Sequence, residues 1–101
     1  MVEKLKESQA LKLLVELQGI YRKEGGQNFD SGIAAAIASL SDEKISEKDR
    51  WSQACSIYRT MAGSKSGFSD FYIDRDTVEQ RIIANARLDY IRQELWTLFG
   101  Y

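Results

Sequence analysis

The chain has 101 residues, of which 44% are hydrophobic and 29% charged, and its net charge is −1. This composition is typical of one globular domain covering residues 1–101 and excludes the disordered and fibrous classes. Histidine is absent, which excludes Ser-His-Asp and Cys-His catalysis and histidine-ligated metals.

The first stretch, from about Val2 to Glu24, predicts an amphipathic helix. Its apolar residues recur at the three- and four-residue spacing of one helix face. They are Ala10, Leu13, Leu14, Leu17, Ile20 and Tyr21. Gly25 and Gly26 are expected to end this helix, because glycine accepts the left-handed conformation that closes a helix.

A second helix is predicted to begin near Asn28 or Asp30, since either side chain can cap a first turn. It is expected to fade between Ser41 and Ile45. Its apolar side consists of Ile33, Ala36, Ile37 and Leu40. The charged run that follows, residues 41–50, alternates in sign and indicates a solvated joint between helices.

A third helix is predicted from Ser46, because Ser46 and Asp49 have the spacing of a capping box. It should continue to Gly63, where glycine interrupts the pattern. The apolar seam consists of Trp51, Ala54, Cys55, Tyr58, Met61 and Ala62. We expect Cys55 to be a small buried hydrophobe rather than a reactive thiol.

The fourth predicted helix begins near Asp74 or Asp76 and ends at about Phe99. Its main apolar stripe is Ala84, Leu88, Ile91, Leu95 and Leu98, with Val78, Ile82 and Ala86 widening it. We expect Trp96 and Phe99 to join the core as well. The polar residues Arg81, Asn85, Asp89 and Arg92 are expected on the other side.

The segment between the last two helices, Gly63 to Asp76, combines two glycines with four large apolar residues, three aspartates and one arginine. A short strand, an extended loop and a turn of irregular helix are all compatible with it. We favour a loop folded back over the bundle, because no second strand-like run is present to pair with it. Its aromatic residues Phe68, Phe71 and Tyr72 would then cap one end of the core. The predicted fold is all-α, a compact bundle of about four helices with an irregular aromatic-rich loop before the last helix.

Four acidic residues, Asp70, Asp74, Asp76 and Glu79, fall within ten positions. Capping of the last helix, contact with a partner and metal binding are three interpretations. The ligand spacing of a calcium loop is missing, so we predict neither a metal nor a cofactor. We also predict no catalytic residue, and we do not expect an enzyme. The even spread of charge argues against direct nucleic-acid binding.

The expected location is the cytoplasm. A lone Cys55 cannot form an internal disulfide, and the start Met-Val-Glu-Lys lacks the apolar core of a secretory signal. The longest apolar run, Ile33 to Ala38, is too short to cross a bilayer. We therefore expect no contact with membranes.

The C-terminal portion, Ser56 to Phe99, resembles a family of small bacterial immunity-type proteins encoded beside polymorphic or contact-dependent growth inhibition toxins. The pattern is an amphipathic helix, a glycine-containing segment, Phe-(Asn or Ser)-Asp with apolar residues, and a long closing helix. The matching residues are Ile57, Tyr58, Arg59, Gly67, Phe68, Ser69, Asp70, Phe71, Tyr72, Asn85, Leu88, Asp89, Ile91, Arg92, Leu95 and Leu98.

The resemblance implies a protein that binds and neutralises a cognate toxin, such as a nuclease, by occluding its active site. The partner-binding residues would be the acidic set Asp70, Asp74, Asp76 and Glu79, together with Phe68, Phe71 and Tyr72. The alternative is a non-catalytic helical adaptor or a homodimeric interaction module. The sequence leaves the oligomeric state open.

Overall fold

The computed structural model describes residues 2–25, 27–63, 68 and 71–100, with residues 2–4, 27 and 100 described by their backbone only. Four α-helices account for most of them: α1 (Val2–Glu24), α2 (Asp30–Ser41), α3 (Glu47–Gly63) and α4 (Val78–Gly100). A short 3₁₀ turn, η1 (Gln27–Phe29), leads into α2. The described part of the chain contains no strand, and the predicted all-α bundle is confirmed.

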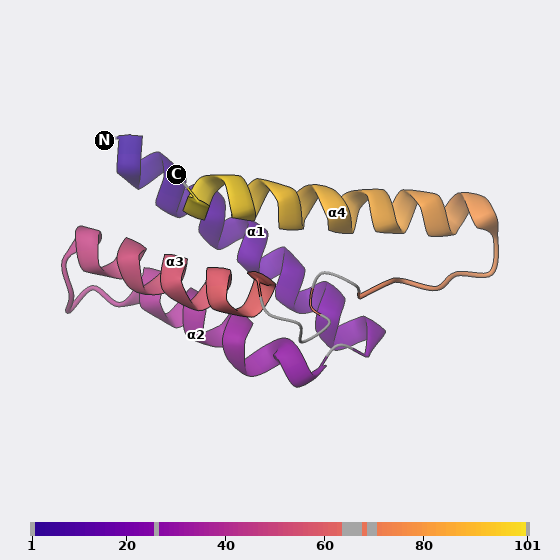
Figure 1. Cartoon of the computed structure of the whole chain (residues 1–101), viewed down its shortest axis with the longest axis horizontal. Helices are drawn as coiled ribbons and strands as arrows, with labels where there is room; N and C mark the ends of the chain where they lie inside the picture. Colours follow the sequence, from indigo (N-terminus) through magenta and orange to yellow (C-terminus); the bar gives the residue numbers. More distant parts are fainter. Residues whose placement is uncertain (1, 26, 64–67, 69–70, 101) are drawn as a thin grey trace.

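The helices are arranged so that α1 and α3 each pack against both α2 and α4. Figure 1 shows α1 crossing the bundle diagonally, with α4 along one edge. The molecule is elongated, measuring 45 × 25 × 20 Å. The first turns of α4 extend beyond the end of α3, and the extended chain that precedes α4 runs back beneath them (Figure 1).

The buried core is built from the predicted apolar stripes. Its helical members are Ala10, Leu13, Leu14, Leu17, Tyr21, Ile33, Ala36, Leu40, Ala54, Tyr58, Leu88, Ile91, Leu95 and Phe99. Three further buried residues come from connecting segments: Phe29, Phe68 and Ile73. The half-buried Cys55 packs against this core and donates a hydrogen bond from its Sγ to the Phe99 carbonyl at 2.7 Å. The connections between helices therefore contribute to the core as well as linking its parts.

The predicted boundaries of α1 and α3 are confirmed. Helix α1 ends at Glu24, and Gly25 follows with a φ of 97°, a left-handed conformation that favours glycine. Helix α3 begins after Ser46, whose Oγ accepts the backbone N–H of Asp49 at 3.2 Å. This is the capping interaction that the sequence indicates.

The predicted caps of the other two helices are wrong. Asp30 forms an ion pair with Arg22 of α1 and accepts a hydrogen bond from Gln18, and no side-chain cap is present at the start of α2. Helix α4 begins at Val78, later than Asp74 or Asp76, because Thr77 supplies the cap: its Oγ1 accepts the Gln80 N–H at 3.1 Å.

The predicted apolar surface of α4 also needs correction. Val78 and Ile82 do not widen the core stripe, since they are 60% and 63% exposed, and Ala86 is exposed too. Trp96 is 38% exposed, with the Arg59 guanidinium 5.6 Å from its ring centre. Phe99 is buried as expected. Helix α4 thus has more apolar residues than its contact with the bundle can cover.

The joint between α2 and α3 is mostly exposed, as expected, but Arg50 folds inward. Its Nη1 donates to the Ile45 carbonyl at 2.9 Å, and its Nε lies 3.3 Å from Glu7 of α1. Only 15% of the Arg50 side chain is exposed.

Among the residues described, no helix is long and apolar enough to span a bilayer.

The cap of α4 provides a first prediction. Thr77→Ala should lower the free energy of unfolding by about 1 kcal/mol, because the first turn loses a side-chain acceptor. The matched control, Asp76→Ala, should leave it within about 0.5 kcal/mol, the usual range for exposed positions. Urea unfolding followed by circular dichroism measures both. A larger loss in the free energy of unfolding for Asp76→Ala than for Thr77→Ala would show that Asp76 caps the helix.

Candidate functional site

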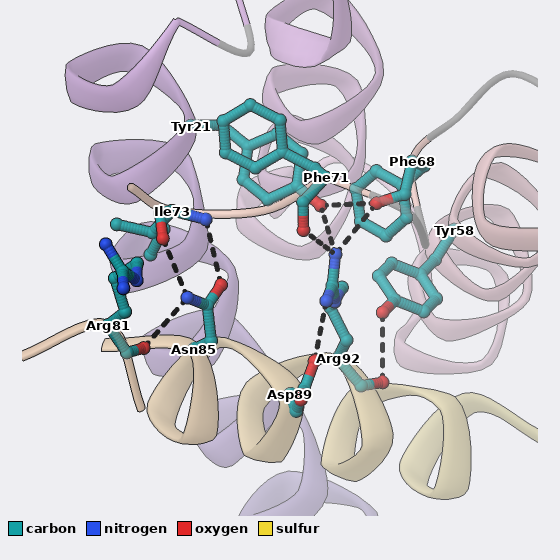
Figure 2. Close-up of polar contacts among 9 residues, drawn as sticks. All are labelled: Tyr21, Tyr58, Phe68, Phe71, Ile73, Arg81, Asn85, Asp89 and Arg92. Atoms are coloured by element: carbon teal, nitrogen blue, oxygen red, sulfur yellow. Dashed lines mark hydrogen bonds and ion pairs between the residues drawn. The ribbon is translucent and has the colours of Figure 1, made fainter. Parts of the chain in front are cut away.

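Residues 71–77, which we call the strap, run from the core to the start of α4, with a bend at residues 76 and 77. Extended chain outside a sheet has backbone groups that need partners when they are buried. The Asn85 side chain of α4 forms hydrogen bonds with both backbone polar groups of Ile73. The Ile73 N–H donates to Asn85 Oδ1 at 2.8 Å, and Asn85 Nδ2 donates to the Ile73 carbonyl at 2.7 Å (Figure 2). The asparagine side chain thus replaces the neighbouring strand that the strap lacks.

Arg92, two turns further along α4, holds the beginning of the strap. Its Nη1 donates to the carbonyls of Phe68 and Phe71 at 3.0 and 3.1 Å, as Figure 2 shows. Its Nη2 pairs with Asp89 at 2.7 Å. The Arg92 side chain is only 13% exposed. We call Asn85 and Arg92 together the clasp.

An aromatic cluster packs beside the clasp. The ring of Tyr21 stacks on Phe68 and Phe71, with centroids 5.0 and 4.5 Å apart, and Phe29 meets Tyr21 edge-on. The Tyr21 hydroxyl donates to the Phe68 carbonyl at 2.7 Å and accepts from Arg92 Nη1 at 3.2 Å. Apolar stacking and the clasp therefore fix the same short segment.

Burial and hydrogen bonding together set the pKa values of Tyr21, Tyr58 and Arg92. Burial raises the pKa of Tyr21, although the hydrogen bond from Arg92 opposes the rise, and burial also raises the pKa of Tyr58. Burial would lower the pKa of Arg92, but its hydrogen bonds to Asp89 and Tyr21 outweigh burial and raise that pKa. Arg92 therefore remains a cation, and both tyrosines keep their hydroxyl protons.

The second half of the strap is fixed by Arg75. Its guanidinium makes a bidentate ion pair with Glu24 at the end of α1, at 2.9 and 2.7 Å. The hydrogen bond from Arg75 lowers the pKa of Glu24. Arg81 Nη1 donates to the Arg75 carbonyl at 2.9 Å, which ties the same point to α4.

The structure distributes the predicted partner-binding residues over two environments. Phe68 is fully buried and Phe71 is half-buried against Tyr21, so the prediction that Phe68 meets a partner is wrong. Phe68 and Phe71 pack in or against the core as expected, whereas Tyr72 does not. Tyr72 is 59% exposed. Asp70 lies outside the described residues.

The three predicted acidic residues that the structure describes lie on the strap and in the first turn of α4. Asp74 and Asp76 are exposed on the strap, where the Asp74 carboxylate accepts the Arg75 N–H at 3.0 Å and lies 3.7 Å from Arg81. Glu79 is in the first turn of α4. Because it lies two residues before Arg81, its side chain points to a different side of the helix from that of Arg81. In the described ranges, no three Asp, Glu, His or Cys residues are placed to hold a metal.

A pocket of about 590 Å³ lies between α3 and α4. Its lining comprises Tyr58, Ala62, Gly63, Phe68, Asp89, Arg92, Gln93 and Trp96. Two charged residues in this lining, Asp89 and Arg92, already form an ion pair with each other, and Arg92 also donates a hydrogen bond to the Phe68 carbonyl. The pocket therefore offers a ligand little unused charge.

The outward side of α4 is the feature that the sequence reasoning missed. It carries the exposed residues Val78, Ile82, Ile83, Ala86 and Tyr90, which we call the outer face. At 100° per residue, these positions lie opposite the buried stripe of Leu88, Ile91 and Leu95. Two separate apolar stripes are visible in the sequence once the residues are assigned by angle. Ile83 and Tyr90 are the members that a single-stripe interpretation leaves out.

No known protein family, curated protein or solved structure matches this chain. The resemblance to immunity-type proteins therefore remains a prediction. Several of its residues, namely Tyr58, Phe68, Phe71, Asn85, Asp89 and Arg92, lie in or around the clasp (Figure 2). The residues that carry the resemblance therefore include those that hold the strap.

The clasp provides a second prediction. Arg92→Leu removes the side-chain donor of the Phe71 carbonyl and leaves the Phe68 carbonyl with the Tyr21 hydroxyl as its side-chain donor. It should lower the free energy of unfolding by roughly 3 kcal/mol. Asp89→Ala removes only the exposed partner of the same arginine and should cost at most about 1 kcal/mol. Urea titration compares the two variants. Equal losses would contradict the role given to the buried carbonyls.

A third prediction concerns alkaline pH. Because burial raises the pKa of Tyr21 and Tyr58, their contribution to stability is complete below the unfolded tyrosine pKa of about 10 and falls as pH rises above it. The free energy of unfolding should therefore decline above about pH 10. Tyr58→Phe removes one of these groups and should make the decline less steep. An unchanged slope in that variant would show that Tyr58 does not titrate on unfolding.

Proposed function

We propose that this protein is an immunity protein that binds a cognate bacterial toxin and blocks its active site. The observation that carries the proposal is a fixed strap with alternate residues exposed. Tyr72, Asp74 and Asp76 are exposed, whereas Ile73 is buried and Arg75 is half-buried. Alternate side chains of an extended segment point to opposite sides. The strap therefore presents one aromatic ring and two carboxylates together.

The clasp makes this surface suitable for tight binding. A segment held in one conformation loses little entropy when a partner binds it. Asn85, Arg92 and the Arg75–Glu24 ion pair hold the strap from both sides. An exposed tyrosine is a favourable anchor at the centre of an interface, since its ring buries area and its hydroxyl finds a polar partner.

The charge of the strap suggests the kind of toxin site it fits. A nuclease cleft must be positive to hold phosphates, so carboxylates can enter it and speed association. Asp74 and Asp76 supply that charge. Inhibition then requires occupancy of the cleft and no covalent chemistry.

A fourth prediction tests this function. The genes beside this one are searched for a toxin domain, the protein is co-produced with that domain, and cell growth is scored. The wild type should protect the cells. Asp74→Lys combined with Asp76→Lys should remove protection and lower affinity roughly 100-fold, because like charges then face each other.

The matched control is Glu43→Lys combined with Glu47→Lys, which changes net charge equally at exposed positions in the joint between α2 and α3. It should protect as well as the wild type. Circular dichroism checks that all variants remain folded. Failure of the wild type to protect would contradict the proposed function, whereas full protection by the strap variant would place the contact elsewhere.

A further inference from the structure

We propose that the outer face of α4 binds a second copy of this chain, giving an antiparallel helix pair with its two-fold axis at Ile83. The proposal concerns a different surface from the strap and does not depend on the proposed function. It uses neither Asp74 nor Asp76.

The first argument is the amount of apolar side chain left in solvent. Ile83 is 71% exposed, and Val78, Ile82 and Tyr90 are 60%, 63% and 50% exposed. They fall within slightly more than three turns of one helix face. A surface helix of a globular protein normally has one apolar stripe, and a contiguous exposed patch marks an interaction site. Figure 1 shows that α4 lies along an edge of the bundle, where another helix can approach it.

The second argument is charge complementarity between two copies. Glu79 and Arg87 lie on this side of α4, four residues before and four residues after Ile83. An antiparallel partner with its two-fold axis at Ile83 therefore sets Glu79 of each copy opposite Arg87 of the other. A parallel pair in register would set like charges together, which is unfavourable. The face is thus complementary to itself in one orientation.

Both Glu79 and Arg87 can form further hydrogen bonds or ion pairs. Glu16 of α1 accepts from Arg87 Nε and Nη2 at 2.8 and 2.7 Å. Within the described chain, Arg87 Nη1 makes no hydrogen bond and Glu79 no ion pair. A guanidinium has five N–H donors, so Arg87 can keep Glu16 and still receive a second carboxylate. The Arg87 guanidinium also lies 5.2 Å from the Tyr90 ring centre, which keeps the cation beside the outer face.

The interface is small. A helix pair of three turns falls at the low end of specific interfaces, below about 1,200 Å² in total. We therefore expect a reversible dimer with a dissociation constant of roughly 1–100 µM. Sedimentation equilibrium of the full chain over a range of concentrations measures it.

A fifth prediction follows for substitutions at the axis. Ile83→Glu sets a carboxylate against its own copy across the two-fold and should abolish the dimer over the same concentration range. The control, Ala38→Glu, adds the same charge at an exposed position of α2 and should dimerise like the wild type. Circular dichroism confirms folding, since Ile83 has little packing to lose. A monomeric wild type, or a dimer that survives Ile83→Glu, would overturn the proposal.

A charge exchange tests the orientation. Glu79→Arg alone and Arg87→Glu alone each set like charges across the pair, and each should weaken self-association roughly tenfold. An equimolar mixture of the two variants restores both opposite-charge contacts, so it should form a heterodimer at wild-type strength. The lost Glu16 contact in Arg87→Glu is an exposed ion pair and costs little. A mixture that associates no better than its components would exclude the antiparallel register.

Discussion

A single constraint organises this molecule: extended backbone enters the core, and its polar groups must find partners there. Ile73 is 3% exposed, yet it belongs to no helix. An unpaired buried amide or carbonyl costs about 1–3 kcal/mol. Asn85 satisfies both groups of Ile73, and Arg92 satisfies the carbonyls of Phe68 and Phe71. Two polar side chains on one helix thus allow a non-helical segment to complete an all-helical core.

Tyr21 connects this arrangement to the rest of the bundle. Its position in the apolar stripe of α1 brings its ring against Phe68 and Phe71, and its hydroxyl meets Arg92 of α4. The strap is consequently held by α1 and α4 together. The Arg75–Glu24 ion pair repeats the same bridge at the other end of the strap. This double attachment explains how exposed strap residues can have a fixed geometry without belonging to a helix or a sheet.

The helices and their core stripes could be predicted because their periodicity is local. The left-handed turn at Gly25 and the cap by Ser46 could also be predicted from the sequence, since each depends on neighbouring residues. Asn85 and Arg92 were predicted to lie away from the core, and that prediction is wrong. Their partners are backbone groups 12 to 24 positions away in the sequence. A helical wheel of α4 shows only the residues of that helix, so it cannot reveal these partners. The cap by Thr77 was missed because three nearby aspartates offered equally good candidates.

The outer face illustrates a different limit. Val78, Ile82 and Ala86 were assigned to the core stripe of α4, and Ile83 and Tyr90 were not assigned, because a helix of a bundle was expected to bury one face. The structure separates the apolar residues of α4 into a core stripe and an exposed stripe. Helix α4 therefore completes the core and holds the strap, and in our proposal its outer face also binds a second copy.

The central claim is that the clasp makes the strap part of the cooperative fold, and amide hydrogen exchange at Ile73 tests it most directly. Its N–H is bonded only to the Asn85 side chain among the described residues. Exchange as slow as that of the Leu88 and Ile91 amides of α4 is predicted, since release would then require global unfolding. Exchange as fast as that of Asp76 would show that the strap opens by itself and would contradict the account.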